Sequence, residues 1–314
     1  MVDVAVCVLT FRRNDDLREL LPELLEHLAS AERSLPFPVT AGVLVVDNDP
    51  DGGAEPVVAP YVGSSPVRYV AEPTPGIAAA RNRALDEAPP EGLVVFLDDD
   101  ERPLEGWFEG MVTTWHEHRS AAVGGPVEAV LRGDVDPWIV AGGFFERDFR
   151  REFRTGHPVT VAPTGNLLLD MSRINAKGLR FDASIGLSGG EDTLFTRQLV
   201  DAGEQIIWCQ EAAVLDPVPP SRLTRRWVMR RVFFVANAST RASLRTPGPV
   251  RRRLLFRARY ATTGVARVLI GAAQLLTGTA SRSPRRQARG AGTTARGLGA
   301  TTAVLGLRFD EYRR

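Results

Sequence analysis

Apolar runs rich in valine and leucine alternate with helical patterns along the first hundred residues. Helical spacing of apolar residues recurs over Asp15–Ala31 and Ile77–Ala88. This alternation predicts βαβ units around a mostly parallel sheet flanked by helices, an α/β fold. The four runs that predict strands are VDVAVCVLTF at 2–11, VTAGVLVVDND at 39–49, VRYVAEP at 67–73 and LVVFLDDD at 93–100.

Polar side chains follow each predicted strand at the point where it ends. They are Thr10 and Arg12, then Asp47 and Asp49, then Glu72, and then Asp98 to Glu101. Because parallel strands end at the same edge of a sheet, we expect these groups to share one crevice, which is where α/β proteins bind ligands.

The fourth predicted strand ends in three consecutive aspartates, Asp98, Asp99 and Asp100, followed by Glu101. An acidic turn on the surface is the simpler interpretation. Its position directly after a fully apolar strand favours a cation site instead, because adjacent carboxylates repel unless a cation lies between them. Mg²⁺ or Mn²⁺ takes oxygen ligands, often one or two carboxylates together with substrate phosphates. The run therefore predicts a site that holds a nucleotide diphosphate through a metal.

The middle of the chain, from about 104 to 215, is irregular and punctuated by glycine and proline. Near its end, SGGEDTLFTRQLVDAG begins as a glycine-rich loop and continues as a helix. Glu191 and Asp192 fall at the start of this helix, where acids also stabilise the helix dipole. A carboxylate on such a mount suits a general base.

From Arg222 onward the chain is helical in pattern and strongly basic. It has 21 arginines against Asp310 and Glu311, so residues 1–221 carry a net charge of −18 in a chain of net charge +1. Helix breaks are expected at Pro247–Pro249 and within 277–292. Arginines recur at helical spacing directly after PVPPS, at Arg222, Arg225, Arg226, Arg230 and Arg231. This spacing predicts that one or two of them contact a diphosphate, although a solvated helical face has the same pattern.

Arginine mixed with leucine, isoleucine and phenylalanine over 251–276 is typical of an interfacial helix or of a helix packed on the catalytic body. An anionic membrane surface is the expected partner of this tail, and nucleic acid is not. The longest charge-free apolar stretch, Val268–Ser281, is shorter than the roughly 20 residues that span a bilayer. The N-terminus lacks the pattern of a signal peptide. We expect a cytoplasmic protein, peripheral at the inner face of the membrane.

Several function classes are disfavoured by missing motifs. No GxGxxG follows the first strand and no GxxxxGK[ST] occurs, which argues against a dehydrogenase or a P-loop ATPase. Cys7 and Cys209 are far apart and belong to no CxxC pair, so neither a disulfide framework nor a zinc site is expected.

These motifs together, in this order, resemble the family 2 inverting glycosyltransferases of the GT-A fold, and most closely the bacterial succinoglycan-type glucosyltransferases. The resemblance covers almost the whole chain. The pieces that carry it include VCVLTFRRNDDL, VLVVDNDPDG, PGIAAARNRAL, VVFLDDDERPLEGW, TGNLLL, GGEDTLFTRQLVDAG, the W..EA.V.D.VP.SR pattern and GLRFDEYRR.

The resemblance implies roles for individual residues. Nucleotide binding would fall to Thr10, Arg12, Asp47 and Arg81, together with the aspartate triplet. Asp98 and Asp100 would be the DxD pair, with Asp98 toward the ribose and Asp100 on the metal. Asp192 would be the catalytic base, oriented by Glu191. The remaining assignments, to the diphosphate or the acceptor, are Gly189, Gly190, Trp208, Arg222, Arg226 and Arg230.

Two departures from the wider family pattern bear on the mechanism. Many GT-A enzymes use a histidine as a further metal ligand, where this chain has Asp216, which becomes the candidate ligand. The Q-x-x-R-W signature of processive synthases is broken by Leu223 before Arg226–Trp227. Transfer of one sugar is therefore favoured over polymerisation.

The expected protein is a metal-dependent inverting glycosyltransferase that moves one sugar from a nucleotide donor, UDP-glucose by default, to a lipid-linked or small-molecule glycan acceptor. Its GT-A domain would span 1–221, with a donor half at about 1–103 and an acceptor half at about 104–221, and 222–314 would be a basic helical extension. A nucleotidyltransferase is one alternative, but its usual glycine-rich basic loop is missing after the first strand. A non-catalytic scaffold that binds membrane or nucleic acid is the other.

Overall fold

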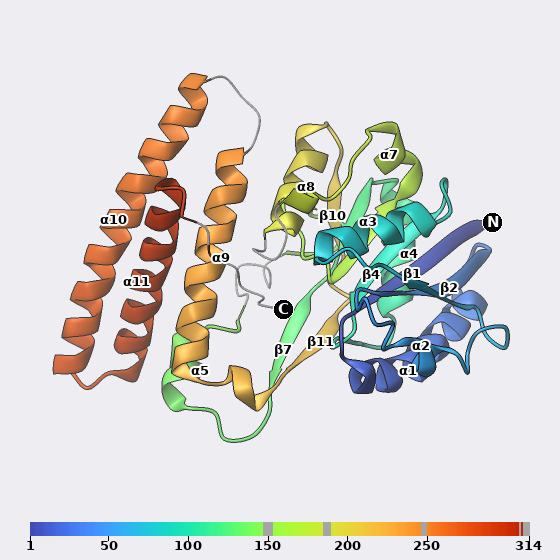
Figure 1. Cartoon of the computed structure of the whole chain (residues 1–314), viewed down its shortest axis with the longest axis horizontal. Coiled ribbons are helices and arrows are strands. Elements are labelled where there is room, and N and C mark those ends of the chain that lie inside the picture. Colours follow the sequence, from blue (N-terminus) through green and yellow to red (C-terminus); the bar gives the residue numbers. More distant parts are fainter. Residues whose placement is uncertain (147–152, 185–189, 246–249, 308, 310–314) are drawn as a thin grey trace. The chain divides into compact units, whose positions relative to one another are not determined.

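The computed structural model describes residues 1–146, 153–184, 190–245, 250–307 and 309 (Figure 1). The chain forms two compact units, each made of several segments. The first comprises 1–128, 147–186 and 195–216, and the second comprises 129–146, 187–194 and 217–314. Each unit is considered by itself. The predicted boundary at residue 221 stays a prediction.

An eight-stranded sheet, in the order β3-β2-β1-β4-β9-β6-β10-β8, is the centre of the first unit. β1 pairs in parallel with β2 and with β4, and β2 pairs in parallel with β3. The expected mostly parallel sheet is therefore confirmed. The strands are β1 (Val2–Thr10), β2 (Val39–Asp47), β3 (Val67–Ala71), β4 (Leu93–Asp98), β6 (Ala122–Gly124), β8 (Pro158–Val159), β9 (Asn166–Asp170) and β10 (Ile206–Trp208).

Helices cover both faces of this sheet. Successive residues of β1 point to opposite faces, so Val6 and Val8 join one buried cluster while Cys7 and Leu9 join the other. One cluster is completed by α1 (Asn14–Ser34), α2 (Glu55–Val58) and α4 (Trp107–His118). The other is completed by α3 (Ile77–Glu87), α7 (Met171–Ala176) and the second part of α8 (Glu191–Asp201).

The middle of the chain is more regular than its glycine and proline content indicates. Its apolar run NLLL forms β9, which lies antiparallel between β4 and β6. Asn166 at the start of β9 fixes this region, because its side chain accepts from Trp107 Nε1 at 2.8 Å and donates to the carbonyls of Pro126 and Ala212. A three-stranded sheet has the order β5-β11-β7, from β5 (Arg102–Pro103), β7 (Val127–Leu131) and β11 (Val214–Val218).

The second unit is helical. It contains α5 (Pro137–Gly142), the short 3-10 helix η2 (Pro220–Arg222), α9 (Arg225–Arg245), α10 (Val250–Ala280) and α11 (Pro284–Val304). The predicted break at Pro247–Pro249 lies outside the described residues. The predicted break within 277–292 is much narrower than expected, since α10 continues to Ala280 and α11 begins at Pro284 with Ser283 as its N-cap. Proline at the first helical position allows this immediate restart.

Glycines form the contact between α10 and α11. A Cβ on Gly271 would lie 2.6 Å from the backbone nitrogen of Thr294 and 2.7 Å from the carbonyl oxygen of Gly290. A Cβ on Gly264 would likewise lie 3.2 Å from the carbonyl oxygen of Gly297. The two backbones therefore approach so closely that side chains are excluded between them. No helix in the described part of the chain is both long and apolar enough to span a membrane.

We predict that Gly271→Ala destabilises the protein, although alanine favours an isolated helix by about 1 kcal/mol. The added methyl group has to push the two helix backbones apart, which should lower the free energy of unfolding by about 1–3 kcal/mol. Urea unfolding followed by circular dichroism measures the change. Gln274→Ala, on an exposed position of the same helix, is the control. An unchanged or raised stability of Gly271→Ala would contradict the close packing.

Candidate active site

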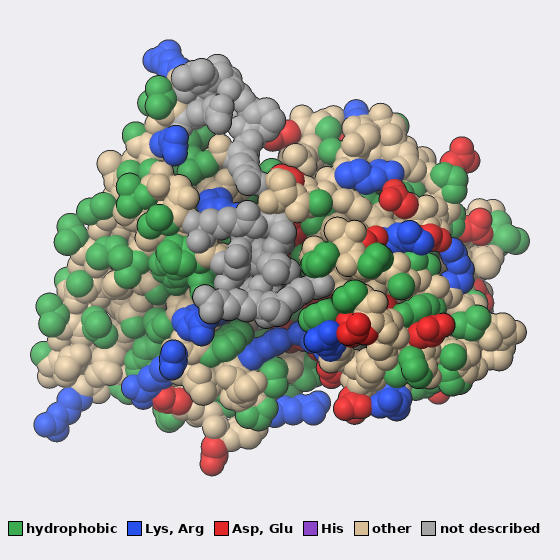
Figure 2. Space-filling model, in the orientation of Figure 1, with side chains coloured by type: hydrophobic (Ala, Val, Ile, Leu, Met, Phe, Trp, Pro, Cys, Tyr) green, Lys and Arg blue, Asp and Glu red, His purple; other side chains and the backbone are tan. Residues whose placement is uncertain are grey.

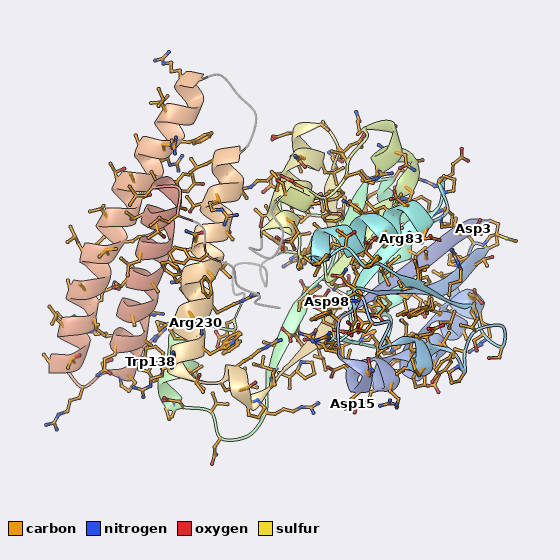
Figure 3. The ribbon with its side chains drawn as sticks, viewed as in Figure 1. Asp3, Asp15, Arg83, Asp98, Trp138 and Arg230 are labelled. Carbon is orange, nitrogen blue, oxygen red and sulfur yellow. The ribbon has the colours of Figure 1, made fainter. Side chains whose placement is uncertain are left out.

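The register of the central strands gathers polar side chains at one edge of the sheet. Thr10 pairs with Asp47 across β1 and β2, and Leu9 pairs with Asp98 across β1 and β4. Asp98 is the last residue of β4 (Figure 3). The predicted convergence of the strand ends is therefore what this structure has.

Asp99 is held by two groups from the end of β1 and the residues after it. Thr10 Oγ1 donates to its carboxylate at 2.8 Å, and the Arg13 guanidinium donates at 2.8 Å. The same guanidinium lies 2.6 Å from Asp100. Asp99 is almost fully buried, whereas Asp98 and Asp100 are only partly so. Asp99, the middle aspartate, is therefore held in place by hydrogen bonds inside the fold, whereas Asp98 and Asp100 on either side of it remain partly exposed.

Four carboxylates repel one another around Asp98. Burial raises the pKa of Asp98 to about 6, and the charges of Asp100 and Asp216 add to this rise while Arg81 and Arg13 oppose it. Burial and the same neighbours raise the pKa of Glu101 well above its usual range. Burial also raises the pKa of Asp99 to about 7, against the opposing charge of Arg13. Asp216 thus lies close enough to belong to this acidic cluster, which we define as Asp98, Asp100, Glu101 and Asp216.

Gly165 makes room for this acidic cluster. A Cβ at that position would lie 2.7 Å from Asp98 Oδ2 and 2.9 Å from Glu101 Oε1. The loop before β9 can therefore pass directly over the carboxylates only because it has no side chain there. Next to it, Thr164 Oγ1 is buried and makes no hydrogen bond among the described residues.

The donor set of the acidic cluster fits a hard divalent cation. All its groups are carboxylates, and burial, followed by the charges of the neighbouring carboxylates, raises the pKa values of Asp98 and Glu101. The described residues contain no group of three or more protein side chains arranged to enclose a metal by themselves. Mg²⁺ or Mn²⁺ often binds through one or two carboxylates and completes its shell with substrate phosphates and water.

A second set of polar contacts orders the end of β2. Asp47 is fully buried and accepts hydrogen bonds from the Ala54 and Asp49 amides and from Tyr69, at 2.9, 2.9 and 3.0 Å. Burial raises the pKa of Tyr69, and its hydrogen bond to Asp47 raises it further. Arg12 reaches Asp49 and Asp51, both at 3.1 Å. Asp47 therefore shapes the turn, and Arg12 lies above it, more than half exposed.

The loop before α3 is tied to the same strand end. The Asn48 side chain donates to the carbonyls of Glu72 and Thr74 and accepts from the Gly76 amide. On α3 itself, Arg81 is buried with its guanidinium over the Phe181 ring, 5.4 Å from the centroid. Arg81 is also the main charge that opposes the raised pKa of Asp98. Arg81 is therefore a buried cation of the site and does not face solvent.

Asp192 and Glu191 begin α8, as expected, and their immediate surroundings lie in the second unit. Asp192 Oδ1 accepts from the Thr193 amide at 2.6 Å, and Glu191 is almost fully buried. Gly190 has a positive φ of 93° and packs against Ala238 of α9, where a side chain would be strained. Gly189 lies outside the described residues.

The arginines after Asp216 have separate surroundings. Arg222 lies over Trp227 and Arg230 over Phe234, with guanidinium-to-centroid distances of 5.9 and 5.6 Å. Arg226 is exposed. Trp208 is fully buried in the core of the first unit and donates to Gln210, so its ring is used for packing.

Other arginines among the predicted diphosphate contacts also have partners in the structure. Arg225 is bidentate on Asp136 at 2.5 and 3.0 Å, and the same aspartate caps α5. Exposed pairs of this kind contribute little to stability.

Sequence analysis missed several residues of the site. The sequence does not distinguish Arg13 from its neighbour Arg12 as the arginine that contacts the aspartates. It places Glu101 in the acidic run but indicates no function for it. Gly165 and Asn48 were not singled out. In the sequence, only the second arginine of TFRRND and the glycine of TGN mark these positions. Neither residue type indicates by itself that the position lies next to the aspartates.

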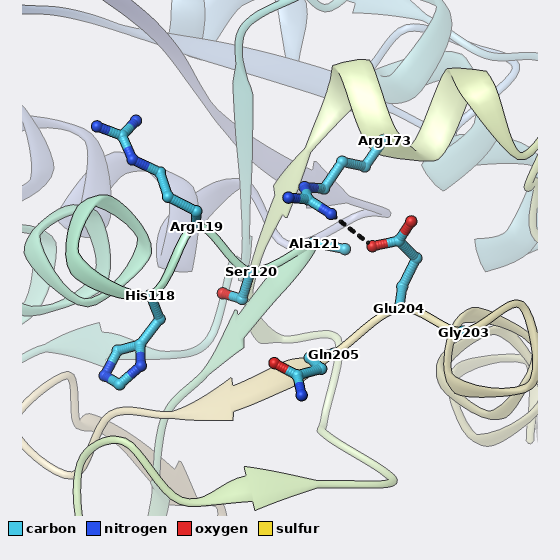
Figure 4. Close-up of a pocket in the computed structure, with 8 residues that line it drawn as sticks. All are labelled: His118, Arg119, Ser120, Ala121, Arg173, Gly203, Glu204 and Gln205. Atoms are coloured by element: carbon cyan, nitrogen blue, oxygen red, sulfur yellow. Dashed lines mark hydrogen bonds and ion pairs between the residues drawn. The ribbon is translucent and has the colours of Figure 1, made fainter.

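A cavity of about 330 Å³ lies elsewhere in the first unit (Figure 4). It is lined partly by Ser120 and Gln205, which directly precede β6 and β10, and the Arg173–Glu204 ion pair closes one side. β6 runs in the same direction as β4, because both are antiparallel to β9. The cavity is therefore at the amino ends of these strands, at the edge opposite Asp98.

A mixed sheet with an acidic cluster at the carboxyl end of β4 is the arrangement expected of a GT-A glycosyltransferase. The comparisons agree: the chain matches Glycosyl transferase family 2 over residues 5–172. It is also 35% identical to the succinoglycan biosynthesis protein ExoM of Rhizobium meliloti (strain 1021), over 74% of this chain and 72% of that protein. The chain belongs to glycosyl transferase family 2, and it is an enzyme of the glycosyltransferase class.

Solved structures share this fold. The mannosyltransferase PcManGT from Pyrobaculum calidifontis, in complex with GDP-Man and Mn²⁺, superposes with a TM-score of 0.63 at 19% identity over 93% of this chain and 85% of that one. S. aureus TarS 1–349 in complex with UDP-GlcNAc gives a TM-score of 0.51 at 17% identity, over 92% and 90% of the two chains. The expected GT-A fold is thus confirmed.

We predict that Asp98→Asn flattens the fall in stability between about pH 4 and pH 6 in metal-free buffer. The folded pKa of about 6 lies above the unfolded value of about 3.9, so the folded state binds this proton more tightly. Stability from this group is full below pH 4 and is lost as the pH rises through 6, by up to about 3 kcal/mol. Urea unfolding across this range with EDTA present measures it. With the exposed Asp3→Asn as control, superimposable pH profiles for both variants and wild type would contradict the shift.

Proposed function

We propose that the protein is a metal-dependent inverting glycosyltransferase that transfers one hexose from a nucleotide-diphosphate donor to a lipid-linked or small-molecule glycan acceptor. The single observation that carries this is the acidic cluster at the end of β4, with Asp99 already held by Thr10 and Arg13. Asp98 and Asp100 are then the two members of the triplet that serve the ligand. UDP-glucose is the default donor.

In this proposal the first unit binds the donor. Asp100 would hold the metal with Asp98 beside it, and Asp216, in the same acidic cluster, would be the candidate further ligand. When bound, Mg²⁺ or Mn²⁺ supplies positive charge that stabilises the departing diphosphate. Arg12 and Thr10 lie at the strand ends for the nucleotide, with Asp47 shaping the turn beside them. Arg81, on α3, partly balances the charge of Asp98.

Two relatives support the donor assignment. PcManGT was solved with GDP-Man and Mn²⁺, and TarS with UDP-GlcNAc, so proteins of this fold bind nucleotide sugars. The succinoglycan relative supports an acceptor from the assembly of an exopolysaccharide. We assign the donor to the segment of about 1–103 and the acceptor to about 104–221, with Arg222, Arg226 and Arg230 as candidates for a diphosphate on either substrate.

Asp192 is the proposed base. The acceptor hydroxyl oxygen attacks the anomeric carbon on the side opposite the diphosphate. The new glycosidic C–O bond forms as the bond to the diphosphate breaks, and Asp192 takes the hydroxyl proton. Glu191 and the Thr193 amide orient this carboxylate, and Gly190 allows the turn before it. The configuration at the anomeric carbon is thereby inverted.

We predict that Asp100→Ala weakens Mn²⁺-dependent UDP binding by about tenfold or more, since even residues that only support a metal ligand are worth 10–100-fold. Calorimetric titration with UDP and with GDP, each with and without Mn²⁺, measures the effect. Asp3→Ala removes an exposed aspartate at the opposite end of β1 and serves as control. UDP binding that does not depend on metal, or that survives in Asp100→Ala, would overturn the metal assignment.

We predict that Asp192→Asn lowers turnover by about 10²–10⁴-fold while leaving donor affinity within about twofold, because only the proton transfer is lost. Release of nucleoside diphosphate in the presence of acceptor measures turnover, and calorimetry measures affinity. Asp201→Asn, at the other end of α8, is the matched control. If turnover of Asp192→Asn equals that of the control, another group is the base.

A further inference from the structure

α10 buries the side that has no side chains. In an ordinary amphipathic helix the large apolar residues face the core. In α10 the buried positions are Gly264, Gly271 and Gly278, spaced seven residues apart, and each meets the backbone or side chains of α11. The helix therefore packs against α11 through its glycines, and most of its leucines take no part in that contact.

Most large apolar side chains of α10 face solvent. The exposed fractions of six of them range from 50% for Val265 to 72% for Leu276. Such a continuous exposed row is unusual on a soluble surface and marks an interaction site. We call it the α10 apolar row, and it consists of Leu254, Leu255, Val265, Leu269, Ile270 and Leu276. Figure 2 shows hydrophobic side chains along this helix.

Positive charge brackets the row at both ends. Arg251 and Arg259 lie one turn before and after Leu255 and are exposed, and Arg282, Arg285 and Arg289 are exposed just beyond the other end. Residues 250–304 contain eleven arginines and no acidic residue. Burial lowers the pKa of Arg296, and the positive charge of the nearby Arg267 lowers it further. No acid of this hairpin balances them.

We propose that the α10 apolar row docks on the surface of an anionic lipid bilayer, with its leucines among the acyl chains and its bracketing arginines on the phosphates. Leucine on one side of a helix with arginine at its margins is the pattern of a helix that lies in the membrane interface. Each arginine near an anionic surface adds attraction that salt weakens. The inference rests on the second unit alone and does not depend on the donor site.

Charge argues against a second copy of the chain as the occupant. Two α10 rows packed face to face would bring together two sets of arginines with no carboxylate on either hairpin to separate them. Like charges in an interface cost free energy, whereas lipid phosphates neutralise them. The anionic bilayer satisfies both the apolar row and its flanks.

The test is flotation of the full-length protein with vesicles of phosphatidylcholine alone or mixed with phosphatidylglycerol. We expect binding to the anionic vesicles that weakens in high salt. The triple variant Leu269→Gln/Ile270→Gln/Leu276→Gln should bind at least about tenfold more weakly, since interfacial binding scales with apolar area. These side chains are over half exposed, so the variant should keep its circular dichroism spectrum and its UDP affinity.

Two controls separate the contributions. Val62→Gln changes an equally exposed apolar residue of the first unit and should leave vesicle binding unchanged. Arg251→Gln/Arg259→Gln/Arg285→Gln should weaken binding to anionic vesicles and reduce its salt dependence. The proposal is overturned if the triple leucine variant binds as wild type does, or if neutral and anionic vesicles bind equally. It is also overturned if light scattering finds a dimer that this variant dissociates, or if only RNA is bound.

Discussion

Mutual repulsion of carboxylates at the end of β4 is the constraint around which the first unit is built. Burial alone raises the pKa of Asp98 and Glu101, and the charges of Asp100 and Asp216 raise both further. A fold can tolerate this arrangement only if nearby cations and donors hold part of the charge. Thr10 and Arg13 do so for Asp99, and Arg81 does so for Asp98. The remaining negative charge is available for a ligand, which is how a binding site differs from a structural ion pair.

The sheet register explains why these particular groups meet. Because β1, β2 and β4 are parallel and end together, the residues just past each strand face one another without any long loop. The antiparallel β9 then brings Gly165 against Asp98 and Glu101 from the other side. Asn166, the next residue, is fixed by three hydrogen bonds to Trp107, Pro126 and Ala212. The glycine thus cannot move away from the carboxylates without breaking a buried polar network.

The sequence predicts those parts of the fold where a residue pattern is compatible with only one kind of element. Apolar strands buried on both faces, such as β1 and β4, can only belong to a covered sheet. The run NLLL was ambiguous, since a short apolar run carries no information on its direction or partners, and β9 was missed for that reason. In the site, the aspartates can be predicted because three consecutive aspartates after an apolar strand are unusual. Arg13 cannot, because the choice between Arg12 and Arg13 depends on backbone geometry after the strand, and Arg12 itself has a positive φ of 55°.

The C-terminal helices show the same limit. Leucine mixed with arginine over 251–276 fits either a helix packed on the body or one lying on a membrane, and composition does not separate the two. What the structure adds is that the side of α10 that packs against α11 carries glycines. Gly264, Gly271 and Gly278 contribute little apolar area for the hydrophobic effect to bury, so close backbone packing, together with small side chains such as Ala288 and Ala300 of α11, holds the hairpin. Its leucines therefore contribute little to folding, and their exposure is free energy available for binding an apolar partner. Every charge along this hairpin is positive, which is why the partner that we propose for the row is negatively charged.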